Sequence, residues 1–223
     1  DEMEDALGVA KELNERGFEV IINFFGEEVK SRDQVYSAAA IYAQIIWEVW
    51  SRSIRARVSV KPSQLGLKID RNFYRDRLAY VAEEAFLYRV PLEIDIETED
   101  TVAETVFSTI ALAKNYPGLN VRQALAMNFE DSFTHLYNLT WDGVKVRLCK
   151  GAYESKYGEN EIAGRFLSAA SHLLHKKANP DFATHDLWLL NQMFLSRNIW
   201  SGVCGFQFLF GLRKKTWKEL AEK

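Results

Sequence analysis

The sequence predicts an α/β fold of the (β/α)8 barrel type, with parallel strands around an axis and helices in an outer ring. Short β-rich runs alternate with longer helical stretches along all 223 residues, with a repeat of about thirty residues, the size of one βα unit. No glycine-rich loop follows the first predicted strand, which argues against an open dinucleotide-binding sheet. We therefore expect one barrel domain over residues 1–223.

Seven segments have the composition of buried strands. They are residues 18–25, 57–62, 92–97, 119–125, 145–151, 182–185 and 203–210. Between and after them, apolar residues spaced three and four apart predict helices. These are residues 32–50, 73–89, 101–114, 130–138, 161–177, 187–199 and 214–223. Asp100 and Asp186 precede two of these helices and are expected to cap them.

A closed barrel of this type needs eight strands, because an open parallel sheet leaves unpaired backbone groups along its edges. The sequence contains only about seven βα units. We therefore expect a barrel domain that is truncated at its C-terminal end, without the last strand and helix.

Composition excludes several classes of protein. The formal net charge is −3 at pH 7, which argues against a nucleic-acid partner. The longest apolar stretch, residues 38–50, is interrupted by Gln44 and Glu48, and no basic and apolar leader opens the chain. We expect a cytoplasmic protein, and peripheral association with a membrane stays open.

The cysteine and histidine pattern does not predict a metal site or a disulfide. Cys149 and Cys204 each lie inside an apolar run rather than at a paired spacing. His172 and His175 lie three apart near the end of a predicted helix, but no third ligand is evident. A histidine near a helix C-terminus is favoured by the helix dipole alone.

Polar side chains recur near the C-terminal ends of the predicted strands. In segments 57–62 and 92–97 apolar residues alternate with polar ones, so the apolar set is expected to face the helices. Five polar residues are expected on the opposite, axial side: Asn23, Gln123, Arg147, His185 and Gln207. Charged groups there are costly to bury unless they are paired or bound to a ligand, so this end is the predicted active site. The alternative is that these side chains only form ion pairs with one another and close this end of the barrel.

Two lysines, Lys61 and Lys150, lie near strand ends and have more than one possible role. Lys61 ends the second predicted strand, where a lysine can form a Schiff base with a carbonyl substrate. Its neighbours Pro62 and Ser63 supply no adjacent cation, so a Schiff-base barrel enzyme is a runner-up hypothesis. Lys150 has the opposite parity from Arg147, unless the turn after it redirects its side chain.

Five segments together resemble the proline dehydrogenase family. They are residues 58–66 (VSVKPSQLG), 94–97 (IDIE), 146–153 (VRLCKGAY), 183–186 (ATHD) and 206–211 (FQFLFG), and they occur in the family's order. The resemblance implies a barrel that oxidises L-proline to 1-pyrroline-5-carboxylate by hydride transfer to the N5 atom of FAD. Electrons would then pass to a quinone or another acceptor.

The resemblance also implies roles for individual residues. Lys61 would pair with the carboxylate of proline, Asp95 would orient the site, and Arg147 would lie near the reactive edge of the flavin. Leu148 and Tyr153 would shape the proline pocket. The other residues expected to contact the cofactor are Gln123, Lys150, Gly151, Ala152, Thr184, His185 and Gln207.

The sequence departs from the family pattern in several places. The tyrosine and adjacent arginine pair that grip the proline carboxylate in the family are absent from this sequence, so weaker substrate affinity is expected. Asn23 and Gly205 stand where the family usually has acids, and Leu125 stands near a position that is commonly aromatic. A catalytically weak or inactive flavin-binding barrel that serves as an assembly module is therefore the alternative, and a homo-oligomer or a completing second chain stays open.

Overall fold

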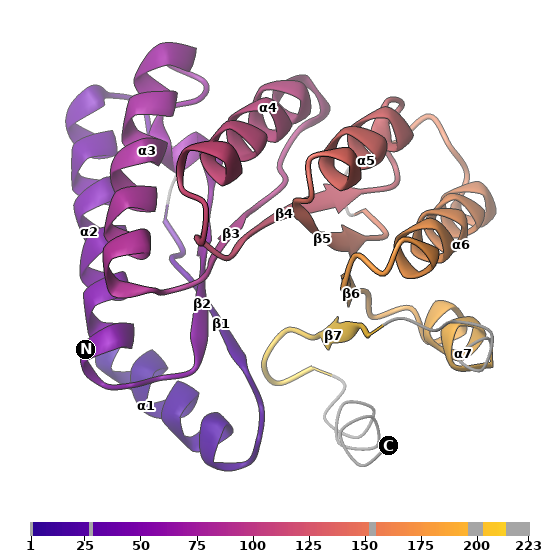
Figure 1. The fold of residues 1–223 in the computed structure, drawn as a ribbon, viewed down its shortest axis with the longest axis horizontal. Helices are drawn as coiled ribbons and strands as arrows, with labels where there is room; N and C mark the ends of the chain where they lie inside the picture. Colours follow the sequence, from indigo (N-terminus) through magenta and orange to yellow (C-terminus); the bar gives the residue numbers. More distant parts are fainter. Residues whose placement is uncertain (1, 27–28, 152–154, 196–202, 213–223) are drawn as a thin grey trace. The chain divides into compact units, whose positions relative to one another are not determined.

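A computed structural model of the chain describes residues 2–26, 29–151, 155–195 and 203–212 (Figure 1). The chain divides into two compact units, Asp1–Gln123 and Ala124–Lys223. The order of the strands follows the order of the chain, from β1 to β7. The strand pairs described within each unit are parallel, as the alternation of strands and helices predicts. That the whole chain forms one domain stays a prediction.

The first unit contains four of the predicted strands and three of the predicted helices. Its elements are α1 (Glu2–Glu15), β1 (Val20–Asn23), α2 (Arg32–Ser51), β2 (Ala56–Val60), η1 (Pro62–Leu65), α3 (Arg71–Tyr88), β3 (Leu92–Ile94), α4 (Glu99–Asn115) and most of β4 (Val121–Ala126). Helix α1 and the short 3-10 helix η1 were not predicted. Because α1 buries only Leu7 and Ala10, its apolar stripe is too narrow for a clear helical signal.

The second unit contains the end of β4 and the remaining predicted strands. Its further elements are α5 (Ser132–Trp141), β5 (Lys145–Cys149), α6 (Glu159–His175), β6 (Asp181–Ala183), α7 (Leu187–Leu195) and β7 (Gly205–Gln207). The predicted helix 214–223 and the last residues of the predicted helix 187–199 lie outside the described residues.

The structure confirms one of the two predicted N-terminal helix caps. The carboxylate of Asp186 accepts hydrogen bonds from the amides of Trp188, at 2.9 Å, and Leu189, at 3.2 Å. The prediction for Asp100 is wrong, because α4 has Thr98 at its N-cap position and Asp100 lies in the first turn. A carboxylate in the first turn still interacts favourably with the helix dipole, which gives Asp100 a different local role.

The core of the first unit lies between its strands and the helices α2 and α3, which pack against each other (Figure 1). Register pairs Val58 with Leu92 and Val60 with Ile94, and all four side chains are fully buried. They belong to one apolar cluster with buried residues of both helices, Tyr42 among them. The apolar residues of β2 and β3 therefore face the helices, as their alternation predicts.

An aromatic row forms the corresponding core of the second unit. Phe182 of β6 is fully buried and contacts the ring of Phe166 in α6, with 6.1 Å between ring centroids. On its other side it contacts Phe206 of β7 at 5.9 Å. Leu148 of β5 lies in register with Phe182, so these residues form the row that faces the helices.

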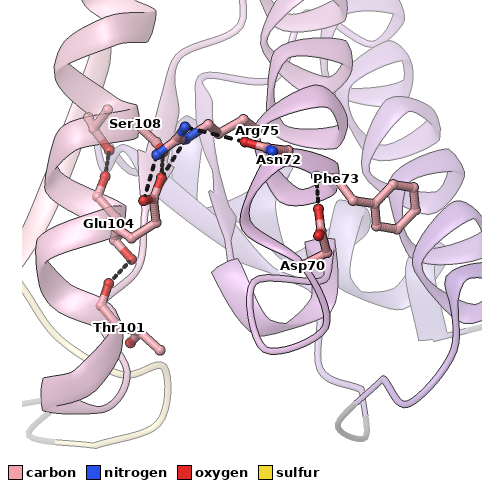
Figure 2. A network of polar contacts seen from close by, with 9 residues as sticks. Asp70, Asn72, Phe73, Arg75, Thr101, Glu104 and Ser108 are labelled. Carbon is pink, nitrogen blue, oxygen red and sulfur yellow. Dashed lines mark hydrogen bonds and ion pairs between the residues drawn. The ribbon is translucent and has the colours of Figure 1, made fainter.

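A buried carboxylate joins α3 to α4, as Figure 2 shows. The guanidinium of Arg75 donates through Nε and Nη2 to the two oxygens of Glu104, each at 2.7 Å. The hydroxyl of Ser108 donates to the same carboxylate at 2.9 Å. Burial by itself raises the pKa of Glu104, but the hydrogen bonds from Arg75 and Ser108 outweigh it and hold that pKa below its usual range.

Replacing Glu104 by Gln is expected to lower the free energy of unfolding by about 1 kcal/mol at pH 7, since a charged, two-point contact is lost. The pKa of Glu104 is lower in the folded chain than in the unfolded chain. The stabilisation is therefore complete above the unfolded pKa, about 4.3, and is lost as pH falls through the folded value. Urea unfolding at a series of pH values measures both effects.

The exposed Glu83 of α3 offers the matched control, Glu83→Gln. This variant is expected to unfold like the wild type at every pH tested. Equal stability of Glu104→Gln and the wild type at pH 7 would contradict the proposed contribution of the ion pair.

Candidate functional site

In the first unit a polar row runs across the face opposite the buried apolar row. Register places Asn23, Ser59, Glu93 and Arg122 side by side on β1 to β4. Asn23 thus lies on the face opposite the apolar row, as predicted. The next residues of the same parity are those that follow the ends of β2 and β3, where the predicted catalytic residues stand.

Lys61 and Asp95 lie just past the ends of these neighbouring strands. The amide of Asp95 donates to the carbonyl of Val60 at 2.9 Å, which keeps the two chain segments paired beyond the strand ends. The carboxylate of Asp95 accepts from the amide of Ile96 at 2.9 Å. The ammonium group of Lys61 lies 5.0 Å from the ring centroid of the exposed Phe25. The backbone therefore places Lys61 and Asp95, two of the predicted catalytic residues, at the ends of neighbouring strands.

Gln123 does not lie where the alternation was expected to place it. It is in register with Ile94 in the row that faces the helices, and it is fully buried. Its side-chain carbonyl accepts from the hydroxyl of Thr109 in α4 at 2.5 Å, and its amide donates to the carbonyl of Ile94 at 3.2 Å. The axial placement was wrong because every residue of β4 is buried, which leaves no alternation to set the parity.

In the second unit Arg147 and Gln207 lie on the face opposite the aromatic row, as predicted. Register places Arg147 beside Asp181 and Gly205, and Gln207 in the next row. The side-chain amide of Gln207 donates to the carboxylate of Asp181 at 2.6 Å. A Cβ atom on Gly205 would lie 2.4 Å from an oxygen of Asp181, so a side chain at this position requires the Asp181 carboxylate to shift.

Leu148 has a different environment from the one its expected role requires. It is fully buried in the row with Phe182, the row that contacts α6. The structure thus places Leu148 in the core beneath the helices, and its contact with a substrate stays a prediction.

Beyond the ends of β5 and β6, Lys150 holds two carboxylates. Its ammonium group donates to Glu159 at 2.6 Å and to Asp186 at 2.9 Å. The hydrogen bonds that Lys150 donates, first to Glu159 and then to Asp186, raise the pKa of Lys150. Burial by itself raises the pKa of Asp186, but the hydrogen bonds from Lys150 and from two helix amides outweigh it and lower that pKa.

Thr184 and His185 lie beside this cluster. The hydroxyl of Thr184 accepts from the amide of Asp186 at 3.1 Å, and the Thr184 side chain is buried. The ring of His185 lies 5.8 Å from the ring of Phe208. Four residues expected to hold the cofactor, Lys150 to Gly151 and Thr184 to His185, therefore follow two strands that pair directly.

Glu159 and the second role of Asp186 were missed by sequence reasoning. Asp186 was predicted only as a helix cap, although one carboxylate can cap a helix and bind an ammonium group at once. The signal for Glu159 was its place in the first turn of α6, where a carboxylate is favoured.

Gly151 brings the segment after β5 close to the segment after β4. Its φ is +117°, a backbone conformation that side chains disfavour, and an added Cβ would lie 2.2 Å from the side-chain oxygen of Asn128. The hydroxyl of Ser155 donates to the carbonyl of Asn128 at 2.5 Å, so the connection is held at a second point. Ala152 and Tyr153 lie outside the described residues.

No family model matches the chain. Two curated proteins of Bacillus subtilis (strain 168) do. Proline dehydrogenase 2 is 23% identical over 227 residues, which cover 98% of this chain and 74% of that protein. Proline dehydrogenase 1 is 23% identical over 232 residues, which cover 100% of this chain and 76% of that protein. The chain is a distant homologue of the proline dehydrogenases.

Several solved structures share the fold of this chain. Proline utilization A (PutA) from Bdellovibrio bacteriovorus, inactivated by N-propargylglycine, superposes with a TM-score of 0.88 at 20% identity, over 99% of this chain and 29% of that chain. PutA from Bradyrhizobium japonicum gives a TM-score of 0.76 at 19% identity, over 92% of this chain and 25% of that chain. The chain thus has the α/β barrel type of fold, with seven strands among its described residues.

Two further findings concern the part of the chain that the structure describes. No group of three or more histidine, cysteine or acidic side chains there could hold a metal ion. No helix there is long and apolar enough to cross a membrane.

Replacing Gly151 by Ala is expected to destabilise the chain by about 2 kcal/mol more than Gly143→Ala. Both glycines have positive φ, but a Cβ on Gly143 would meet nothing within 4 Å. The difference therefore isolates the clash with Asn128, and overpacking of this kind typically costs about 1–3 kcal/mol. Chemical unfolding of the two variants measures it, and equal losses of stability would show that Asn128 moves aside freely.

Proposed function

We propose that this chain binds FAD and oxidises L-proline to 1-pyrroline-5-carboxylate. The observation that carries the proposal is the arrangement after β5 and β6, where Lys150, Gly151, Thr184 and His185 follow paired strands in a distant homologue of the proline dehydrogenases. Active sites of barrel enzymes lie at the C-terminal ends of the strands, where these residues stand.

The donors in the second unit fit a flavin nucleotide. Arg147, Lys150 and Thr184 offer guanidinium, ammonium and hydroxyl groups, which bind ring oxygens and phosphates. Gly151 lets backbone approach closely, since a side chain there would clash. FAD, when bound, would accept the hydride, and we assign Arg147 to stabilise the negative charge that reduction places on its ring.

The residues of the first unit fit the two charges of an amino acid. We assign Lys61 to the carboxylate of proline, where its ammonium group acts as a point charge. Asp95, on the neighbouring strand, would orient the site. A hydride leaves the carbon beside nitrogen most readily when the amine is unprotonated, so turnover is expected to rise with pH toward the pKa of the bound amine.

One observation favours the alternative, a flavin-binding barrel that is weak or inactive and serves as an assembly module. Lys150 already holds both Glu159 and Asp186, so its charge is partly compensated before any cofactor binds. Flavin binding without reaction is the behaviour that would separate this alternative from the leading proposal.

Incubation with FAD is expected to give a yellow protein whose flavin absorbance bleaches when L-proline is added without oxygen. Lys61→Met is expected to raise the KM for proline at least tenfold while the flavin content stays the same, because a substrate charge loses its partner. Arg147→Met is expected to lose flavin or slow its reduction. Absorbance titration and stopped-flow reduction measure these effects.

Lys11→Met, on the exposed face of α1, is the control for removal of a lysine charge and is expected to behave like the wild type. Protein that cannot be reconstituted with FAD would contradict the whole proposal. A stable yellow protein that proline never bleaches would support the assembly module instead.

A further inference from the structure

The hydroxyl of Tyr42 connects helix α2 to the chain segment that follows β2. Tyr42 is fully buried, and its hydroxyl accepts a hydrogen bond from the backbone amide of Lys61 at 3.0 Å. The same hydroxyl donates to the side-chain carbonyl of Gln64 at 2.5 Å. The ring of Tyr42 packs edge-on against Phe24, with 5.7 Å between centroids. The buried hydroxyl of Tyr42 is thus hydrogen-bonded both to the residue before η1 and to a residue within η1.

The backbone amide of Lys61 depends on this contact. Strand β2 ends at Val60, and Lys61 is the N-cap residue of η1, whose side chain makes no capping hydrogen bond. Past the end of β2 the pairing of strands provides no acceptor for the amide of Lys61. The hydroxyl of Tyr42 is the acceptor instead. This hydrogen bond is partly buried, and an amide shielded from water is costly to leave without a partner, so the bond constrains the backbone at Lys61.

Hydrogen bonds on both sides fix the rest of this segment. The side-chain amide of Gln64 lies 3.5 Å from the carbonyl of Phe24, after β1. On the other side, the amide and hydroxyl of Ser63 both donate to the carboxylate of Glu97, at 2.7 Å and 2.5 Å. Burial raises the pKa of Tyr42, so its hydroxyl keeps the proton that it donates to Gln64.

We infer that Tyr42 is a positioning residue that fixes the backbone of Lys61 and thereby sets where its ammonium group meets the carboxylate of the substrate. This inference rests on the role proposed for Lys61 and deepens it. Tyr42 itself touches neither substrate nor cofactor. Tyr42 binds the backbone amide of Lys61. The ammonium group of Lys61 therefore stays available to bind the substrate.

Tyr42→Phe tests the inference with the smallest change, because the ring and its contact with Phe24 remain. The lost hydroxyl leaves the amide of Lys61 and the carbonyl of Gln64 without their partner. A shift of about 1 Å at a group that binds substrate can cost as much as a hundredfold. We expect the KM for proline to rise about tenfold and kcat to change less, since Lys61 holds the carboxylate before and during reaction.

Tyr74→Phe provides the matched control. Tyr74 of α3 is equally buried in the same unit, but its hydroxyl makes no hydrogen bond to the segment after β2. Hydrogen exchange at the amide of Lys61 is expected to become at least tenfold faster in Tyr42→Phe and to stay unchanged in Tyr74→Phe. This readout needs no activity, and melting curves of both variants report any general loss of stability.

A double-mutant cycle ties the effect to Lys61. In a Lys61→Met background, Tyr42→Phe is expected to raise KM no further, whereas independent effects would multiply. Exchange rates that are alike in the two tyrosine variants would overturn the inference, and so would a multiplicative cycle. If the wild type does not react with proline, the proposed function fails alone, and the exchange rates then decide whether Tyr42 holds Lys61.

Discussion

Register between neighbouring parallel strands decides which side chains can meet in this fold. Val60 pairs with Ile94, and both are buried against helices, so the polar residues on either side of them are turned to the opposite face. Ser59 and Glu93 lie in one row of that face, and Lys61 and Asp95 follow in the next. A slip of one residue in either strand would exchange the core with the candidate site, so the apolar packing under α2 and α3 also fixes the chemistry.

The order of elements and the faces of several strands could be predicted from the sequence. All seven strands occur, and Arg147, Gln207, Lys61 and Asp95 lie on the expected side, because apolar and polar residues alternate there. The prediction for Gln123 failed because β4 is buried throughout, so both faces look alike in the sequence. A strand without alternation needs its neighbours' register before its faces can be assigned.

Contacts between distant positions could not be predicted at all. Nothing near Lys150 in the sequence indicates that Asp186 binds it, since Asp186 follows another strand. Nothing in α2 distinguishes Tyr42 from the other aromatic residues of the same helix, yet its hydroxyl is bonded to the backbone after β2. Side chains that act through hydrogen bonds to distant backbone leave no local pattern, because what they recognise is an amide that every residue has.

The pair formed by Asp181 and Gly205 has a consequence for how sequences of this kind can diverge. The glycine stands where the resemblance to proline dehydrogenases leads one to expect an acid, and the carboxylate of Asp181 fills the space that a side chain at 205 would need. A change at one position therefore affects the other. An acid on β7 is accommodated best where β6 has a small residue, so the negative charge at this level of the fold can be carried by either strand.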